Sequence, residues 1–135
     1  MRIFLDTAPL IYFVEKERRF YQRLLHYFTN CVIHSHILQT SVLTIAEFEI
    51  KPRKLGNEQL IRSCDSLLNT LIEIRNIDIQ TSKTSALLRA HYRSLKSADS
   101  LQLAAALHSD SDVFLTNDKR LKMVKEVNVK LVTDL

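Results

Sequence analysis

Four acidic residues stand at positions where predicted strands end or predicted helices begin. Asp6 follows one apolar, strand-like run and Asp118 closely follows another, while Glu47 and Asp99 lie in the first turns of helical segments. In an open parallel sheet, the carboxyl ends of the strands and the starts of the following helices share one edge. We therefore expect these four carboxylates, which are far apart in the sequence, to converge on a single site.

Such a cluster is unstable without a counter-charge. Two carboxylates about 4 Å apart repel each other by roughly 4 kcal/mol at an effective dielectric constant near 20. Hard divalent cations prefer oxygen ligands, so Mg²⁺ or Mn²⁺ would neutralise the group. A cation held only partly by protein keeps waters, and it can polarise a phosphodiester and activate an attacking water. The chemistry indicated is metal-dependent hydrolysis of a phosphodiester.

Each acid also has a local explanation as part of a helix start. Asp6 and Asp118 suit helix caps, Thr44 and Glu47 have the spacing of a capping box, and Asp99 suits the positive end of a helix dipole. Taken singly, the capping interpretation is the simpler one for each residue. The combination of four acids, each in its own short context, favours a common site.

The elements that must position these acids alternate between strand and helix. Strands are expected over residues 2–5, 37–43, 72–77, 113–116 and 129–132, and helices over 9–14, 20–28, 44–50, 58–71, 81–92, 98–107 and 119–127. The clearest break, residues 51–57, is interpreted as a connection between two helices. This alternation predicts an α/β fold with a mostly parallel central sheet of four to five strands. The length of 135 residues predicts a single domain, 1–135.

Composition excludes several functional classes. Gly56 is the only glycine, whereas nucleotide-binding loops, dinucleotide fingerprints and nucleophile elbows each need several. The 19 basic residues exceed the 15 acidic ones, and gathering four acids at one site leaves the remaining surface more basic still, which favours a polyanionic partner. Cys31 and Cys64 are read as buried thiols of a reducing compartment. With no secretory signal or membrane span in the sequence, the expected location is the cytoplasm.

At the four acids the sequence resembles the PIN-domain ribonucleases, and most closely the VapC-type toxins of prokaryotic toxin–antitoxin pairs. The resemblance covers essentially the whole chain and rests on four motifs in order. They are Phe4-Leu5-Asp6-Thr7-Ala8-Pro9-Leu10-Ile11, Ser41-Val42-Leu43-Thr44-Ile45-Ala46-Glu47, Leu95-Lys96-Ser97-Ala98-Asp99-Ser100-Leu101-Gln102-Leu103-Ala104 and Phe114-Leu115-Thr116-Asn117-Asp118-Lys119-Arg120-Leu121. Ala8 departs from the family, which often has Asn or a similar polar residue there, but no acid of the four motifs is missing.

The resemblance implies a three-layer α/β/α fold and a metal-dependent endoribonuclease. Asp6, Asp99 and Asp118 would surround Mg²⁺ or Mn²⁺, and Glu47 would complete the catalytic acids. Thr116 and Asn117 resemble the polar residues that support the last acid. The family also implies an RNA substrate, a homodimer and inhibition by a cognate antitoxin. The sequence does not identify the residues that contact RNA.

Three other functions fit the sequence less well. A catalytically inactive PIN-like module that binds RNA or protein would tolerate loss of the acids, and all four are present. A phosphatase of the haloacid-dehalogenase type usually needs a second Asp two residues after the first, where this chain has Ala8. A DNA-cutting nuclease would use the same metal chemistry, so only the family resemblance favours RNA over DNA.

Overall fold

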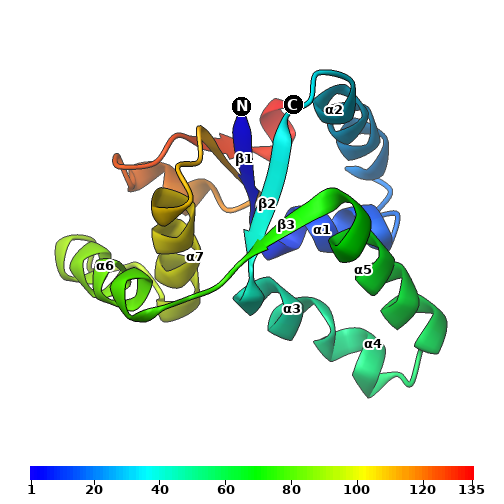
Figure 1. The fold of residues 1–135 in the computed structure, drawn as a ribbon, viewed down its shortest axis with the longest axis horizontal. Coiled ribbons are helices and arrows are strands. Elements are labelled where there is room, and N and C mark those ends of the chain that lie inside the picture. Colours follow the sequence, from blue (N-terminus) through cyan, green and yellow to red (C-terminus); the bar gives the residue numbers. More distant parts are fainter.

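The computed structural model describes all residues, 1–135, and contains one five-stranded sheet with helices on either side (Figure 1). The strands are β1 (Arg2–Leu5), β2 (Ile37–Ser41), β3 (Ile72–Arg75), β4 (Val113–Thr116) and β5 (Val129–Leu131). The helices are α1 (Thr7–Val14), α2 (Tyr21–Ile33), α3 (Val42–Phe48), α4 (Ile50–Lys54), α5 (Glu58–Leu71), α6 (Ile79–His91) and α7 (Ser97–His108). Two short 3₁₀ helices, Lys119–Met123 and Val132–Asp134, complete the chain.

All neighbouring strands in the sheet are parallel, in the order β3-β2-β1-β4-β5. The chain builds outward from β1 through β2 to β3, and it then returns to the other side of β1 to form β4 and β5. The direction of building therefore reverses between β1 and β4. In open parallel sheets, ligands bind in the crevice that forms at such a reversal, beyond the carboxyl ends of the strands.

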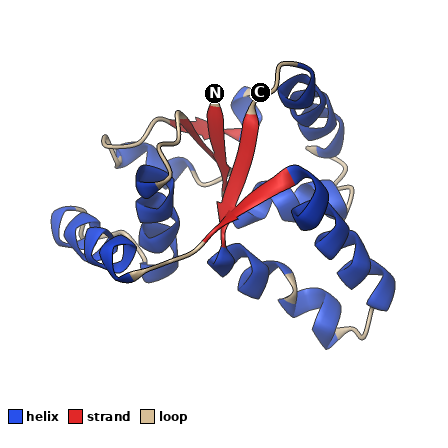
Figure 2. Ribbon diagram, viewed as in Figure 1, coloured by secondary structure: helices blue, strands red, loops and turns tan.

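The sheet separates two hydrophobic cores, which makes the fold a three-layer α/β/α arrangement (Figure 2). Alternate residues of β1 face opposite layers: Ile3 and Leu5 belong to the core shared with α1, α2 and α5, whereas Phe4 belongs to the core shared with α6 and α7. Phe4 stacks on Phe114 of the adjacent β4, with ring centroids 5.6 Å apart. The predicted α/β/α fold with its parallel sheet is confirmed.

Two of the expected element boundaries were wrong near the second motif. The strand expected to reach residue 43 ends at Ser41, because the Ser41 hydroxyl accepts a hydrogen bond from the Leu43 N–H (3.1 Å) and caps α3. The expected break at residues 51–57 contains the short helix α4, with Pro52 in its first turn. Proline is tolerated there because the first N–H groups of a helix have no intrahelical acceptor.

The last expected helix, 119–127, was also wrong in type and length. The chain forms a 3₁₀ helix over Lys119–Met123 and then extends toward β5. Val124 and Val127 are buried in the core beside α7 although they lie outside any helix. Their apolar spacing therefore reports burial in the core and not helical periodicity. None of the helices in the structure is both long and apolar enough to cross a membrane.

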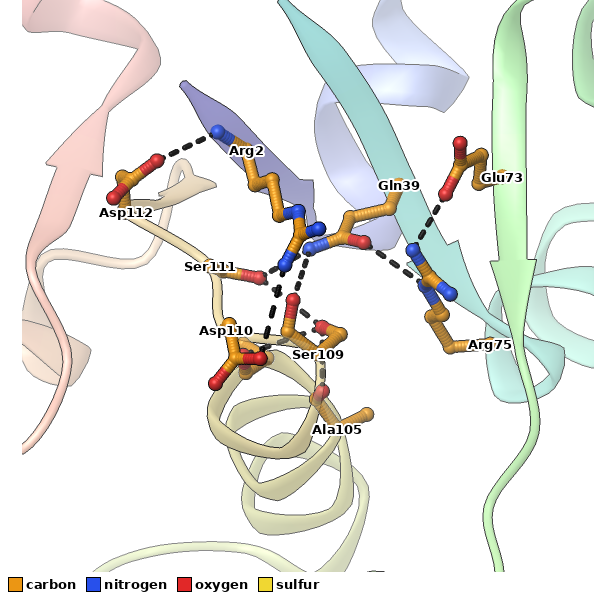
Figure 3. A network of polar contacts seen from close by, with 10 residues as sticks. Arg2, Gln39, Glu73, Arg75, Ala105, Ser109, Asp110, Ser111 and Asp112 are labelled. Atoms are coloured by element: carbon orange, nitrogen blue, oxygen red, sulfur yellow. Dashed lines mark hydrogen bonds and ion pairs between the residues drawn. The ribbon is translucent and has the colours of Figure 1, made fainter.

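A polar network ties the edge strand β3 to β2 and to the end of α7 (Figure 3). Its centre is the Gln39 side chain, which is fully buried. The Gln39 amide nitrogen donates to the Ser109 carbonyl (3.2 Å) and to the Ser111 hydroxyl (2.6 Å), and its oxygen accepts from Arg75 Nε (2.9 Å). The buried amide of Gln39 on β2 is thus paired with groups from two other segments, the end of α7 and β3.

We expect Gln39→Met to destabilise the protein by roughly 1–3 kcal/mol, because it preserves side-chain volume but leaves the partners of the amide unpaired in a buried place. Urea unfolding at pH 7.5, compared with wild type, measures this difference. An unchanged unfolding midpoint would show that water replaces the lost partners without cost.

Candidate active site

The four predicted acids line one pocket at the carboxyl ends of β1 and β4, where the order of the sheet reverses. In Figure 1 this edge lies at the lower end of the strands, where α1 and α3 begin. The pocket measures about 710 Å³. Its lining residues are Asp6, Thr7, Ala8, Ile11, Tyr12, Glu47, Ile50, Asp99, Thr116, Asn117, Asp118, Lys119 and Arg120. The structure thus brings together acids from four separate segments, as the sequence predicts.

Asp6 occupies the innermost position and is held from two sides. One carboxylate oxygen accepts from the Thr7 N–H (2.9 Å) and the other from the Thr116 hydroxyl (2.7 Å). Burial nevertheless raises the pKa of Asp6 to about 6, and the negative charges of Asp99 and Glu47 add to the effect. Desolvation and repulsion thus outweigh two good hydrogen bonds, so this carboxylate is short of positive charge.

Asp99 and Asp118 experience opposite electrostatic environments. Burial and the nearby charge of Asp118 raise the pKa of Asp99 above its usual value. The Arg120 guanidinium lowers the pKa of Asp118, because it forms hydrogen bonds with both carboxylate oxygens, at 2.6 Å to Oδ2 through Nη2 and 3.0 Å to Oδ1 through Nε. Arg120 is therefore a cation built into the rim of an otherwise acidic pocket.

Glu47 enters the pocket from the second turn of α3, and not from the first turn as expected, because α3 already begins at Val42. Its Oε1 accepts from the Thr7 hydroxyl at 3.1 Å, which links the second acidic residue to the first motif. The same threonine offers its N–H to Asp6. One residue, Thr7, therefore orients two of the four acids.

The two predicted supporting residues behave differently. The Thr116 hydroxyl donates to Asp6 and accepts from the Asp118 N–H (3.1 Å), so one side chain joins two acids. Asn117 lines the pocket but donates to the Tyr12 hydroxyl (3.2 Å) and contacts none of the four acids. The position of Thr116 matches a supporting role, whereas Asn117 supports a tyrosine at the pocket wall.

Helix capping by these acids is compatible with their convergence on one pocket. Asp6 does cap α1 and Asp118 caps the 3₁₀ helix that follows β4. The capping-box interpretation of Thr44 was wrong, because Ser41 caps α3 and the Thr44 hydroxyl contacts Thr40 instead (2.7 Å). Capping and convergence are compatible because each cap lies at the strand edge where the pocket forms.

Sequence reasoning missed the polar residues beneath the pocket and the cation beside it. Thr7, Thr40, Ser41, Thr44 and Gln102 are buried and form a connected hydrogen-bond network under Glu47. One signal was available: Gln102 follows Asp99 by three residues, so both lie on one helix face. Arg120 carried no signal that separated it from an ordinary surface arginine.

The acidic pocket offers the donor chemistry of a hard divalent cation but not a ready-made cage. Carboxylate oxygens are the ligands that Mg²⁺ and Mn²⁺ prefer, and the raised pKa values of Asp6 and Asp99 mark uncompensated negative charge. In this structure no three acidic, histidine or cysteine side chains are arranged so that they would hold a metal ion. The donor set fits such a cation, which Asp6, Asp99 and Asp118 would hold, although Asp118 is paired with Arg120 in this structure.

We expect Arg120→Ala to strengthen Mn²⁺ binding a few-fold, since the cation would no longer compete with a guanidinium for Asp118. Lys119→Ala is the matched control, because it removes a positive charge from the same pocket without breaking an ion pair with Asp118. Isothermal titration with Mn²⁺ measures both. Equal effects of the two variants would mean that only overall charge matters, and not the contact.

The chain belongs to the PIN domain family, whose model matches residues 3–127. None of the curated proteins matches the sequence. The assignment therefore rests on the family model, the fold and the four converging acids.

Solved structures with the same fold include components of toxin–antitoxin complexes. A chain of the DNA-bound VapBC complex of Salmonella typhimurium superposes with a TM-score of 0.83 at 16% identity, over 98% of each chain. A chain of VapBC2 from Rickettsia felis gives 0.79 at 18% identity, covering 97% of this chain and 98% of that one. VapC20 of Mycobacterium tuberculosis, a Sarcin-Ricin loop cleaving toxin, gives 0.69 at 15% identity, covering 93% and 98%. At these identities the likeness establishes the fold alone.

Proposed function

We propose that residues 1–135 form a single PIN-like domain that acts as a metal-dependent endoribonuclease, the toxin of a toxin–antitoxin pair. The observation that carries the proposal is the convergence of Asp6, Glu47, Asp99 and Asp118 on one pocket at the reversal point of the sheet. Membership of the PIN domain family and the fold shared with VapBC chains support it. The basic balance of the chain suits a polyanionic substrate.

In the proposed site Asp6, Asp99 and Asp118 would hold Mg²⁺ or Mn²⁺. When bound, such a cation lowers the pKa of a water and stabilises negative charge on a phosphodiester. The protein contributes position: Thr7 and Thr116 fix the Asp6 carboxylate, and Thr7 fixes Oε1 of Glu47. Glu47 Oε2, which accepts no hydrogen bond from the protein, orients the attacking water and takes its proton.

The toxin assignment adds partners to this chemistry. RNA is the proposed substrate, a cognate antitoxin the proposed inhibitor, and a homodimer the proposed assembly, all acting in the cytoplasm. Two of the similar structures are VapBC complexes bound to DNA, and a third is a toxin that cleaves the Sarcin-Ricin loop. The similar structures suggest the substrate and the partners, and the acidic pocket suggests the metal-dependent reaction.

The test is to incubate antitoxin-free protein with total RNA in the presence of Mg²⁺, Mn²⁺ or EDTA. We expect discrete fragments with either metal and none with EDTA, and we expect Asp99→Asn to remove them. Asp110→Asn is the matched control, because it neutralises an exposed acid whose side chain forms only a weak ion pair, with Arg2 at 3.7 Å. The Asp110 variant should cleave like wild type.

Two results would contradict the proposal. Cleavage that persists in Asp99→Asn would point to a contaminating nuclease. Folded wild-type protein that binds RNA without cutting it under any metal condition would favour an RNA-binding module over an enzyme.

A further inference from the structure

Gln102 lies beneath the acidic pocket, is almost completely buried at 1% exposure, and forms no hydrogen bond with any of the four acids. It projects from α7, one turn after Asp99. Its amide oxygen accepts from the Ser41 hydroxyl (2.6 Å), and its amide nitrogen donates to the Thr44 hydroxyl (2.7 Å) and to the Thr7 hydroxyl (3.4 Å). The buried amide therefore joins the first, second and third motifs.

The protons of this network can be counted. The four hydroxyls supply one proton each and the amide supplies two, so six protons are available for seven contacts. Six of the contacts are Ser41 to Gln102, Gln102 to Thr44, Gln102 to Thr7, Thr40 to the Leu5 carbonyl (2.7 Å), Thr44 with Thr40 (2.7 Å), and Thr7 to Glu47 (3.1 Å). The seventh, between the Thr7 and Thr44 hydroxyls (3.2 Å), receives no proton when Thr7 donates to Glu47. No buried side-chain polar atom in the structure lacks a partner.

Two of the contacts fix the donors around Thr44. The Leu5 carbonyl cannot donate, so the Thr40 proton belongs to it, and the short contact between Thr40 and Thr44 must use the Thr44 proton. Thr44 then has none left and must accept from the Gln102 amide nitrogen. An inverted amide, with its oxygen toward Thr44, would leave one of these two contacts without a proton. The orientation of Gln102 thus follows from the network.

The Thr7 hydroxyl links Gln102 to Glu47. Because the second amide proton of Gln102 points at the Thr7 hydroxyl, Thr7 accepts there and directs its own proton to Glu47 Oε1. Without that amide, the Thr7 proton could turn to the Thr44 hydroxyl, 3.2 Å away, and release Glu47. The amide of Gln102 thus favours donation from Thr7 to Glu47, because it already donates to the Thr44 hydroxyl and to the Thr7 oxygen.

We propose that Gln102 is the positioning residue for Glu47, acting through Thr7 to hold Oε1 in place and leave Oε2 for the attacking water. The proposal rests on the nuclease function proposed above and specifies how the buried layer serves it. Gln102 forms no hydrogen bond with any of the four acids, and of its three partners only Thr7 donates to one of them, so we expect its effect on catalysis to pass through Thr7. Partners of this indirect kind typically contribute 10–100-fold in activity.

Gln102→Met tests the proposal, because it keeps the length of the side chain and removes both donated protons. We expect kcat to fall about 10–100-fold with little change in KM for RNA. Gln39→Met is the matched control: it removes another fully buried glutamine amide from the same fold, at a network that does not reach the pocket. That variant should lose stability and keep kcat.

A coupling measurement separates positioning from general destabilisation. In a Glu47→Ala background, Gln102→Met should cause no further loss of kcat, because the residue that it positions is already gone. Thr7→Val should reproduce the effect of Gln102→Met, and the double variant should be no slower than either single one. Independent, multiplying losses in these backgrounds would overturn the proposal, as would a Gln102→Met enzyme with wild-type kcat.

NMR tests the proposed hydrogen-bond arrangement without an activity measurement. By NMR, we expect the Thr7 hydroxyl proton of the wild-type protein to exchange slowly and to show an Overhauser effect to the Glu47 side chain. Both signatures should vanish in Gln102→Met. If they persist there, Gln102 does not direct Thr7 and the inference fails, even if the protein is a nuclease. If they vanish while wild-type protein cleaves no RNA, the arrangement stands and the nuclease function fails instead.

Discussion

Asp6→Asn should make the metal-free protein harder to unfold while abolishing RNA cleavage. The wild-type carboxylate is buried beside two other acids, which raises its pKa from 3.8 to about 6. Asparagine has a similar shape, carries no charge to desolvate or repel, and cannot serve as an anionic metal ligand. We expect stability at pH 7.5 in EDTA to rise by about 1–3 kcal/mol. We expect cleavage to fall at least about 1,000-fold, equivalent to about 4 kcal/mol of transition-state stabilisation.

The pH dependence of this gain has a definite sign. A raised pKa means that the folded state binds the Asp6 proton more tightly than the unfolded state, so wild-type stability falls as the pH rises from about 4 to about 6. Asparagine does not titrate. The gap between variant and wild type should therefore be fully open above pH 6, narrow through that window and close below pH 4.

Urea unfolding in EDTA at pH 7.5 and pH 4, together with the RNA cleavage assay, measures both effects. Asp110→Asn removes an exposed charge outside the pocket and should change neither quantity appreciably. A loss of stability in Asp6→Asn at pH 7.5 would mean that hydrogen bonds from Thr7 and Thr116 outweigh desolvation. In that case the cluster would not be short of positive charge, and it would need no cation to neutralise it.

Thr116→Val should lower metal affinity, RNA cleavage and stability together. The Thr116 hydroxyl, fully buried, is shared between the carboxylate of Asp6 and the N–H of Asp118, and valine has nearly the same shape without it. Losing this link frees two proposed metal ligands at once. We expect Mn²⁺ affinity and cleavage each to fall about 10–100-fold, and stability to fall by roughly 1–3 kcal/mol because buried polar groups lose their partner.

Thr116→Ser keeps the hydroxyl and is the matched control for this prediction. It should retain most of the Mn²⁺ affinity, measured by isothermal titration, and most of the cleavage, although the lost methyl group costs some packing. If serine and valine are equally impaired, the methyl group and not the hydroxyl is what the site requires. If neither is impaired, Asp6 and Asp118 are positioned without Thr116.

Features set by neighbouring residues were predictable from the sequence. Strands β1 and β4 follow from short apolar runs, and Asp6 and Asp118 were identified because each closely follows one of them. Alternation of strand and helix predicted a parallel sheet, and parallel strands end at one edge. The convergence of the four acids was predictable because it depends only on the order of elements and on which residues terminate them.

Other features depended on partners that only the folded chain brings together. Whether Ser41 or Thr44 caps α3 was decided by Thr40 and Gln102, which occupy the Thr44 hydroxyl from β2 and α7. Val124 and Val127 have helical spacing, yet they pack against the α7 layer outside any helix. Local pattern cannot distinguish such cases, because tertiary packing chooses between conformations of similar local energy.

The buried hydrogen-bond network around Gln102 is the clearest feature that the sequence did not predict. Gln102 and Thr7 are 95 residues apart, and no periodicity or motif connects an amide on α7 with a hydroxyl at the start of α1. The ion pair between Arg120 and Asp118 is local, two residues apart, but only the fold places it in the pocket that the other acids line. Which acids meet, and at which edge of the sheet, follows from the order of the elements along the chain. Which distant hydroxyl and amide groups hold those acids depends on the packed layers, because hydrogen bonding needs distances and angles that exist only once the layers pack.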